Sequence, residues 1–537
     1  MSNKNYLSPA FLSIALAIGY FVGSYFSNPF SNKNTNTSKR KILKLIDHID
    51  QNYVDQINTD SVVDMAAKEI MKQLDPHSVY IDKKAKLTIE DKIRGNFVGI
   101  GINFYMKNDT LAVITPIKDG PCHKSGIQSG DRILRANQIT LYGKNFPNDS
   151  LFKHLKGPIN TKVELQVFRK ETDSLFNKTI IREQIPLPSI DASFKIKPYI
   201  GYIRINRFSE KTHTEFKKAI KELFKNNTSS DTLILDLRNN SGGIMSDAVE
   251  IADEFLQKDN LIVKTVNRKN SSHQNIATSG GLFENGQLYV LIDEKSASAS
   301  EIIAGAIQDN DRGTIVGRRS FGKGLVQQEK NLGDGSAIRL TVARYYTPSG
   351  RSIQKPYSSS KRTYFNEFEK RFYNGELYKK DSIKVADSLK YYTKKGRIVY
   401  GGGGIVPDLF IPIEGDYKDH EILMVIKSRG LTSNFVFDVL DKYGRESFIK
   451  SSNEQLYDQV VVLENYYASY CEYINAIFNI EHDFDPFREM INQTIYGEIL
   501  SQIHSEDAFY FKAQIKIDPM IGTILKNNPI NQAPISH

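Results

Sequence analysis

The sequence predicts an α/β core, in which apolar strands alternate with helices, and a separate β-rich segment nearer the amino end. Two strand-turn-helix units predict the core. The first runs over residues 232–255, with a glycine turn at 238–243, and the second over residues 288–308. Apolar runs of five or six residues fit buried strands, and apolar residues at helical spacing follow each turn. Such units build a parallel sheet, and ligands bind at the carboxyl ends of its strands, where both turns lie.

The turn of the second unit contains a candidate nucleophile, Ser298, in the segment Lys-Ser-Ala-Ser-Ala-Ser-Glu of residues 295–301. A serine hydroxyl needs a sharp turn, small neighbours and a nearby base in order to attack a substrate. Backbone N–H groups at a helix start are electropositive and suit an oxyanion, and the N–H of Ala299 is the first such donor. An ordinary Ser-x-x-Glu capping box with Glu301 explains the same residues without chemistry.

A candidate base, Lys323, follows between Gly322 and Gly324. A basic lysine must be neutral, so its pKa must fall from about 10.4 to about 7. Only a buried site has that effect. Gln327 lies four residues further on, where it either orients the amine or is a surface residue without a role.

The same lysine has a competing interpretation, because residues 317–323 fit a phosphate-binding P-loop up to its last position. There the sequence has Gly324 in place of Ser or Thr, and the chain after it looks extended where a P-loop needs a helix. A nucleotide site is therefore disfavoured. The first glycine turn offers a second oxyanion donor in Gly242 or Gly243, unless these glycines serve only the turn.

Four motifs together carry a family resemblance, and their order and spacing make it specific. They are Leu-Asp-Pro-His-Ser at 74–78, Asp-Leu-Arg-Asn-Asn-x-Gly-Gly at 236–243, Ser-Ala-Ser-Ala-Ser-Glu-Ile at 296–302 and Phe-Gly-Lys-Gly-x-Val-Gln at 321–327. The chain resembles the carboxyl-terminal processing peptidases, also called tail-specific proteases. The resemblance covers residues 39–412 and implies a crotonase-like core at 173–412.

Site roles follow from this resemblance residue by residue. It implies Ser298 as nucleophile, Lys323 as general base and Gln327 as the partner of the lysine. It also implies Ala299 and Gly243 as oxyanion amides, with the choice between Gly242 and Gly243 left open. The chain departs from many relatives at Ser241, where they carry Pro.

A PDZ domain is expected ahead of the core, over residues 85–172. The backbone N–H groups of Gly99, Ile100, Gly101 and Ile102 would capture the terminal carboxylate of a peptide, which adds a strand to the sheet edge. The alternative is a small β-rich domain that only spaces two parts of the chain.

The amino end contains an 18-residue span without charge, Pro9 to Phe26, which is just long enough to cross a bilayer or to serve as a secretion signal. No clean Ala-x-Ala cleavage site follows it. We expect residues 1–26 to be an uncleaved membrane anchor and 27–38 a linker. Basic residues tend to stay on the cytoplasmic side of a membrane, so those that follow the span mildly contradict a placement of the rest of the chain outside the cytoplasm. The family resemblance nevertheless implies an inner-membrane anchor with the body in the periplasm.

The remaining parts are helical by pattern. Residues 39–84 form the helical start of the peptidase, and residues 413–537 form a helical extension to which no activity can be assigned. The extension either joins two copies of the chain in a homodimer or docks a substrate. The alternative is that it is a plain helical core.

Composition excludes several function classes. The net charge of +9 is spread over scattered Lys and Arg residues, so no nucleic-acid partner is expected. The two cysteines, Cys122 and Cys471, fall in different predicted domains, and no metal or cofactor motif occurs. A Ser-His-Asp triad is not supported, because the sequence contains no Gly-x-Ser-x-Gly elbow. His77 is interpreted as part of a turn.

These expectations combine into one function: a membrane-tethered, ATP-independent serine endopeptidase that acts on proteins or peptides with free apolar carboxyl termini. It would need no cofactor and no metal. The alternative is a catalytically silent PDZ scaffold that only binds peptides.

Overall fold

The computed structural model describes residues 37–143, 148–225, 231–357, 361–445, 448 and 464–527. The chain divides into two compact units, Met1–Leu74 and Asp75–His537. The first unit contains helices α2 (Thr37–Asn52) and α3 (Thr59–Lys72). The predicted anchor, Pro9 to Phe26, lies outside the described residues. Among the helices that are described, none combines the length and the apolar character needed to cross a bilayer.

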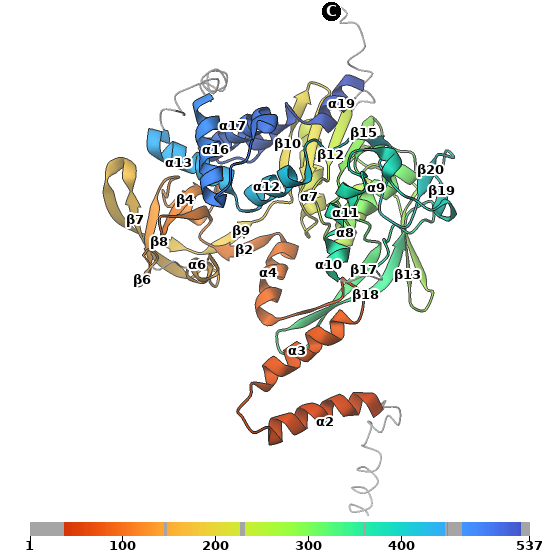
Figure 1. Ribbon diagram of the computed structural model, residues 1–537, viewed down its shortest axis with the longest axis horizontal. Coiled ribbons are helices and arrows are strands. Elements are labelled where there is room, and N and C mark those ends of the chain that lie inside the picture. Colours follow the sequence, from red (N-terminus) through yellow and green to blue (C-terminus); the bar gives the residue numbers. More distant parts are fainter. Residues whose placement is uncertain are drawn as a thin grey trace, which may run out of the picture. The chain divides into compact units, whose positions relative to one another are not determined.

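A six-stranded sheet forms the centre of the second unit (Figure 1). Its strands, in spatial order, are β10 (Ile190–Lys197), β11 (Ile200–Ile205), β12 (Thr232–Asp236), β15 (Gln287–Ile292), β16 (Thr314–Gly317) and β21 (Leu409–Phe410). All neighbours from β11 to β21 are parallel, and only β10 runs antiparallel at the edge. The predicted parallel sheet is confirmed.

Helices cover both faces of this sheet. One face packs against α7 (Thr212–Leu223), α8 (Met245–Asp253) and α9 (Ala299–Asp309). The other face packs against α19 (Pro519–Asn527), whose Met520, Ile521 and Ile524 are buried with Ile234 and Leu291 of the sheet. The end of the helical extension is therefore part of the peptidase core.

A second sheet is antiparallel and includes the two strands that directly follow the lysine loop. Its strands are β1 (Val79–Ile81), β13 (Leu261–Asn267), β14 (Ser272–Ile276), β17 (Leu325–Asn331) and β18 (Ala337–Tyr346). The chain after Lys323 is thus extended, as predicted, and not the helix that a P-loop requires. Smaller elements complete this region: α10 (Lys361–Phe365), α11 (Glu367–Tyr373), β19 (Lys390–Tyr392) and β20 (Ile398–Tyr400).

The β-rich segment is a six-stranded sheet with its own buried core. Its elements are β3 (Ile102–Lys107), β4 (Thr110–Pro116), α5 (Pro121–Lys124), β5 (Arg132–Ala136), β6 (Ile139–Thr140), α6 (Asn148–Leu155), β7 (Lys162–Arg169) and β8 (Ser174–Ile181). A ladder of β2 (Asn96–Gly99) with β9 (Glu183–Pro186) lies at its base, after helix α4 (Lys83–Arg94).

The predicted limits of this segment, 85 and 172, differ from the observed ones. Residues 83–94 are helical, and β8 continues the sheet to Ile181. Strand β8 was missed because Ile180 is its only fully buried residue, so the sequence carries little hydrophobic alternation there.

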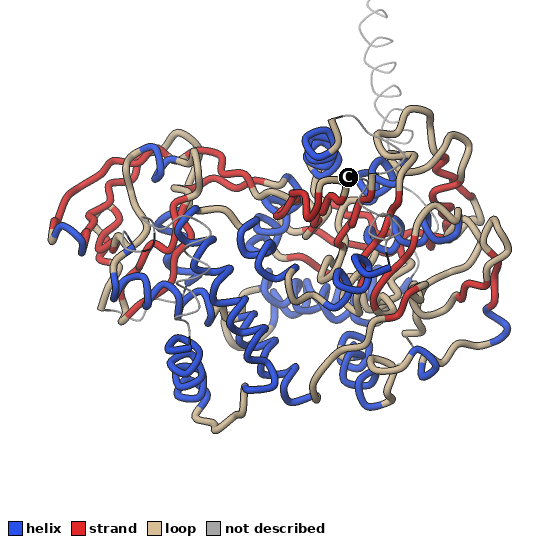
Figure 2. Tube along the Cα trace, turned by 90° about the horizontal axis from the view of Figure 1, so that it is seen from above, coloured by secondary structure: helices blue, strands red, loops and turns tan. Residues whose placement is uncertain are grey.

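Where the structure describes it, the extension also contains α12 (Tyr417–Ser428), α13 (Leu431–Tyr443), α16 (Glu464–Phe478), α17 (Arg488–His504) and α18 (Ala508–Ile515). They enclose an apolar core of their own. Figure 2 shows these helices between the strands of the β-rich domain and those of the central sheet.

Candidate active site

Ser298 occupies a strained turn between strand β15 and helix α9. Its backbone angles are φ 57° and ψ −112°, a region that non-glycine residues rarely adopt. Such a residue costs on the order of 1–3 kcal/mol and persists only where its surroundings enforce it. Helix α9 begins with the next residue, Ala299, and is buried along its whole length. A rigid helix therefore fixes a partly exposed serine at its amino end.

Glu301 joins the serine turn to the lysine loop. Its side chain is completely buried. Oxygen Oε2 accepts hydrogen bonds from the backbone N–H groups of Ser298 and Lys323, each at 2.8 Å. Oxygen Oε1 accepts from the N–H of Gly322 at 2.7 Å and from the hydroxyl of Ser320 at 2.5 Å. Burial raises the pKa of this carboxyl group, and the four hydrogen bonds oppose that shift. Glu301 is therefore more than the helix cap considered above.

Tyr345 makes a second bridge between the same two residues. Its buried hydroxyl lies 3.1 Å from the carbonyl oxygen of Ser298 and 2.7 Å from that of Lys323. Two side chains from different elements thus fix the backbone of Lys323 beside the serine turn.

The Lys323 ammonium contacts Gln327, with Nζ 2.9 Å from Oε1, which is the partner that the family resemblance implies. The amide nitrogen of Gln327 donates to the backbone carbonyl of His77, which fixes the amide oxygen toward the lysine. Burial lowers the pKa of Lys323 to about 8, helped by the charge of Arg339 and opposed by the carboxylates of Glu301 and Asp75. A substantial neutral fraction is then present near neutral pH.

The Asp-Pro-His-Ser turn at 75–78 supports this arrangement. Asp75 accepts from the N–H groups of His77 (2.9 Å) and Ser78 (3.1 Å) and from the hydroxyl of Thr341 on β18 (3.0 Å). Burial lowers the pKa of His77 to about 4, and its Nε2 lies 2.8 Å from the Tyr364 hydroxyl. A neutral His77 with these contacts fits the predicted turn element, which here also holds Gln327.

The first glycine turn lies against the nucleophile. A Cβ atom on Gly242 would lie 2.8 Å from Cβ of Ser298 and 3.0 Å from the backbone nitrogen of Ala299. The N–H of Gly242 donates to Oδ1 of Asn240 at 2.8 Å. By contrast, the N–H groups of Gly243 and Ala299 donate to no acceptor within the described ranges. Two unpaired N–H groups beside a serine can receive an oxyanion.

The nucleophile and the base are not hydrogen-bonded to each other in the described structure. Nζ of Lys323 contacts Gln327, and no bond to Oγ of Ser298 is formed. Catalytic hydrogen bonds are often long before substrate binds. The arrangement supplies a nucleophile, a lysine of lowered pKa and two N–H donors. These are the groups that an acyl-transfer reaction requires.

The predicted carboxylate-binding loop lies between β2 and β3. Gly99 ends β2 and Ile102 begins β3. The carbonyl groups of Ile100 and Gly101 accept from Cys122 and Ile117, each at 3.0 Å, whereas their own N–H groups donate to nothing within the described parts of the chain. Among the described strands, β3 is the edge of its sheet and pairs with β4 alone.

Comparisons with known proteins agree with this geometry. Residues 199–358 match the model of peptidase family S41, and residues 98–180 match that of the PDZ domain. A carboxy-terminal-processing protease of Bartonella bacilliformis is 35% identical over 329 residues, which cover 60% of this chain and 75% of that protein. The chain belongs to peptidase family S41, the family of these carboxy-terminal processing proteases. It is a serine-type peptidase with a PDZ domain.

Two further similarities accompany this assignment. The carboxy-terminal processing protease CtpB of Bacillus subtilis is 33% identical to the peptidase, over 59% of this chain and 65% of that protein. The structure titled photosystem II D1 C-terminal processing protease is 25% identical, covers 59% of this chain and 90% of that chain, and has a TM-score of 0.33.

Some groups of the peptidase site were not found from the sequence. Tyr345, Asn240 and the buried hydrogen-bonding role of Glu301 depend on contacts between distant segments, and only the Ser-x-x-Glu spacing pointed to Glu301. No cluster of His, Cys, Asp or Glu suited to a metal ion occurs among the described residues.

Proposed function

We propose that this serine peptidase cleaves proteins near their carboxyl ends with a Ser298/Lys323 dyad, without nucleotide. One observation carries the proposal: the strained Ser298 and the half-buried Lys323, whose pKa is lowered to about 8, are held together by the same oxygen of Glu301. Neither the strain nor the buried amine benefits the fold, so both point to chemistry.

In the acylation step, the neutral amine of Lys323 takes the proton of the Ser298 hydroxyl as Oγ bonds to the substrate carbonyl carbon. The carbonyl oxygen becomes an oxyanion, which the N–H groups of Gly243 and Ala299 stabilise. Gly242 is the less suitable donor, because its N–H already binds Asn240. Lys323 then gives the proton to the leaving amine, the peptide bond breaks and an acyl-enzyme remains.

In the deacylation step, Lys323 takes a proton from a water molecule, and the oxygen of that water attacks the ester carbon. The ester bond breaks, and the proton returns to Oγ of Ser298. Gln327 acts as a positioning residue in both steps, because its fixed amide oxygen holds the lysine amine at one place.

The PDZ domain would select the substrate by its end. The N–H groups of Ile100 and Gly101, which have no acceptor in the described parts of the chain, suit a terminal carboxylate, and the edge position of β3 suits an added strand. An apolar tail is expected, since PDZ pockets beside such a strand take alternate side chains.

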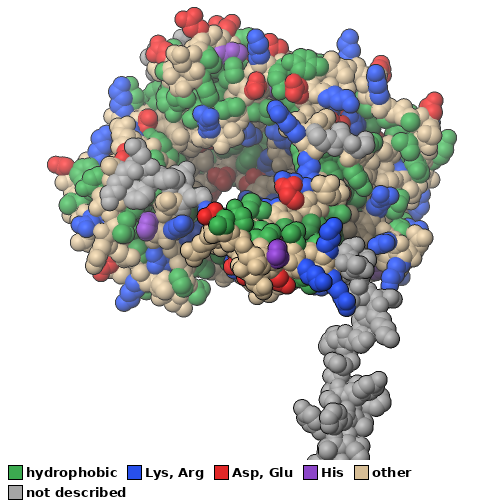
Figure 3. Space-filling view, turned by 60° about the horizontal axis from the view of Figure 1, so that its bottom comes forward, with side chains coloured by type: hydrophobic (Ala, Val, Ile, Leu, Met, Phe, Trp, Pro, Cys, Tyr) green, Lys and Arg blue, Asp and Glu red, His purple; other side chains and the backbone are tan. Residues whose placement is uncertain are grey.

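Two further proposals concern location and assembly. Residues Pro9 to Phe26 would anchor the chain in the inner membrane with its body in the periplasm, which membrane extraction with alkaline carbonate and protease protection of intact cells would test. A homodimer would cover apolar side chains exposed on α2 and α3, such as Leu43, Leu45, Met65 and Ile70. Apolar side chains gather on the face of the molecule shown in Figure 3. Sedimentation of the Leu45→Lys variant would test that assembly.

The test of function compares cleavage of an unstructured protein with an apolar tail in two forms, one with a free terminal carboxylate and one amidated. We expect the full chain to cleave the free-tailed form faster without nucleotide. Ser298→Ala and Lys323→Ala should be inactive, and Lys330→Ala, which changes an exposed lysine on β17, should be as active as the parent. Tail binding without cleavage by any variant would instead favour the PDZ scaffold.

A further inference from the structure

Helix α13 of the extension lies against the PDZ domain. Phe437 on this helix is completely buried. Its ring centre lies 5.1 Å from that of Tyr105 on β3, and the guanidinium of Arg132 on β5 lies 5.1 Å from the same ring. The extension and the PDZ domain therefore share an apolar contact.

Ion pairs surround this contact. Asp441 of α13 accepts from Arg132 at 2.8 Å and lies 3.3 Å from Lys107 and 3.2 Å from Lys170. Asp438, one turn earlier, lies 2.7 Å from Lys107. Both carboxylates of the helix are thus neutralised by cations of the PDZ domain.

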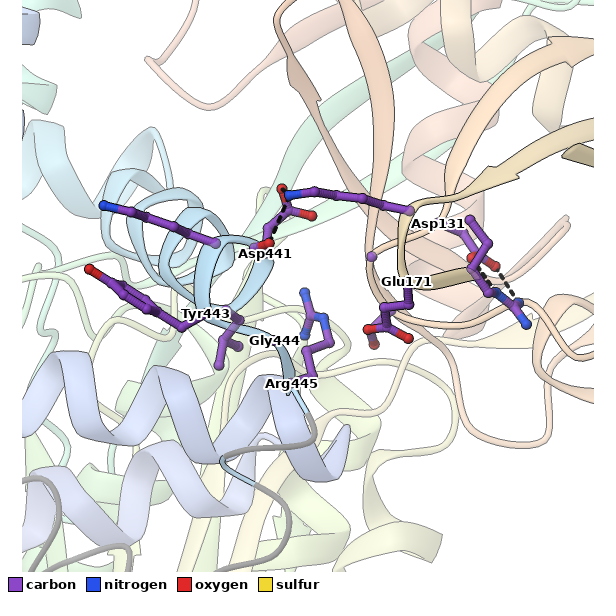
Figure 4. A pocket seen from close by; sticks show the side chains of 12 residues that line it. Asp131, Glu171, Asp441, Tyr443, Gly444 and Arg445 are labelled. Atoms are coloured by element: carbon purple, nitrogen blue, oxygen red, sulfur yellow. Dashed lines mark hydrogen bonds and ion pairs between the residues drawn. The ribbon is translucent and has the colours of Figure 1, made fainter. Parts of the chain in front are cut away.

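A cavity of about 340 Å³ opens beside these pairs (Figure 4). Its walls come from residues 129–131 and 169–171 of the PDZ domain and residues 440–445 of the extension. Asp131 in the wall is neutralised by two hydrogen bonds from Arg169, both at 2.8 Å. At about 30 Å³ per water molecule, the cavity has room for a hydrated small ion.

Arg445 is the exception to this pattern of paired charges. It follows Gly444 at the end of α13 and is only 7% exposed. Neither of its terminal nitrogens has a hydrogen-bond partner among the described residues, and its guanidinium lies 5.2 Å from the Phe437 ring. Burial lowers the pKa of Arg445 to about 10, so the group stays charged at neutral pH. The charges of Asp441 and Glu171 oppose this shift. A buried guanidinium whose terminal nitrogens make no hydrogen bond is nevertheless unfavourable.

Figure 4 shows the Arg445 side chain between Asp441 and Glu171 at the cavity. Glu171 is exposed on the opposite wall, and no ion pair joins it to Arg445 among the described residues. Lys170 and Lys442 line the same space. The planar fork of a guanidinium matches two oxygens of a carboxylate or phosphate group.

We propose that this cavity is a binding site for a small oxyanion of the phosphate or carboxylate type, held by Arg445 with Lys170 and Lys442. The anion supplies the missing partner of the buried guanidinium. Because its ligands come from both the PDZ domain and the extension, the bound anion stabilises their contact. The concentration of this anion then sets how often the cavity is occupied, and so how strongly the PDZ domain is held against the extension.

Equilibrium dialysis of the full chain against radiolabelled inorganic phosphate, at fixed ionic strength, tests the proposal. We expect one phosphate per chain at millimolar concentration. Arg445→Gln should weaken binding by at least about tenfold, the effect of losing a hydrogen bond to a charged group. Arg429→Gln, an exposed arginine outside the cavity, is the matched control and should bind as the parent does. Competition by acetate shows whether carboxylates share the site.

Two further variants keep the test decisive. Lys442→Gln changes an exposed side chain of the wall, so it should fold normally and bind phosphate several-fold more weakly, even if Arg445→Gln fails to fold. Glu171→Gln removes an exposed carboxylate from the wall and should bind phosphate more tightly than the parent. The proposal is overturned if neither the parent nor Glu171→Gln binds phosphate, or if binding is unchanged in both Arg445→Gln and Lys442→Gln.

Discussion

Gln327 accepts a hydrogen bond from the ammonium of Lys323 at 2.9 Å, and its amide nitrogen is held by the carbonyl of His77. A residue 250 positions earlier in the chain therefore decides which atom of Gln327 faces the lysine. The amide contributes an oxygen without a full negative charge, which holds the amine but leaves its pKa low.

The Gln327→Glu variant tests this distinction. A carboxylate at the same place favours the ammonium form, so the midpoint of the pH-rate profile should rise from about 8 by one unit or more. The rate at pH 7 falls accordingly. Gln328→Glu, which adds the same charge at the exposed neighbouring residue, should leave the profile in place. An unshifted profile in Gln327→Glu would mean that Lys323 is not the base.

The parent enzyme should itself gain activity as the pH rises. Lys323 acts only when neutral and has a pKa of about 8, so kcat/KM should increase about tenfold per pH unit below that value and level off above it. Steady-state kinetics on a tailed substrate measure this profile. A rate that is flat between pH 6 and 9 would exclude a lysine base of this pKa.

The same pKa shift predicts an effect on stability. The folded-state pKa of Lys323, about 8, lies below its ordinary value of 10.5, so between these values the unfolded chain binds more protons. The free energy of unfolding contributed by this group therefore rises with pH through that window. Lys323→Met should abolish this rise and be more stable than the parent at pH 7, as measured by urea midpoints at pH 7 and 10. Equal differences at both pH values would contradict the shift.

Glu301→Gln should disconnect the serine turn from the lysine loop. An amide cannot accept at both of its atoms, so at least one buried N–H loses its partner, at a cost of about 1–3 kcal/mol. We expect that loss in the free energy of unfolding, together with a large fall in kcat. Glu329→Gln, which changes an acid of β17 paired with Arg339 at 3.0 Å near the surface, should cost little. A fully active Glu301→Gln enzyme would show that the bridge is dispensable.

Gly242→Ala should inactivate the enzyme through contact with the nucleophile. Gly242 has a φ of +98°, and an added Cβ would lie 2.8 Å from both Cβ of Ser298 and the carbonyl oxygen of Ala297. Gly280→Ala is a matched control, because its φ is +93° but nothing lies within 4 Å of the added atom. Both variants carry the same backbone strain, and only Gly242→Ala should lose activity. Equal activity of the two variants would show that the glycine turn at Gly242 is not part of the active site.

The sequence predicted those features that are encoded locally. Strands β12 and β15, the helices after them and the extended chain after Lys323 follow from apolar periodicity and glycine turns. Ser298 and Lys323 could be named because each lies in a short motif with its own chemical requirement.

Long-range features could not be predicted from periodicity. Tyr345 contacts residues 22 and 47 positions away, and α19 covers a sheet whose first strand begins more than 300 positions earlier, so no local pattern marks either contact. Strand β8 carries little alternation because most of its side chains are exposed or half-buried. Only the fold shows that the terminal nitrogens of Arg445 lack a hydrogen-bond partner among the described residues.

The most direct measurement is the mass of the enzyme after reaction with a serine-directed fluorophosphonate, followed by peptide mapping. We predict a single adduct on Ser298 in the parent, no adduct in Ser298→Ala, and a strongly slowed reaction in Lys323→Ala, because the hydroxyl then lacks its base. An adduct on another serine, or an undiminished rate in Lys323→Ala, would contradict the Ser298/Lys323 dyad.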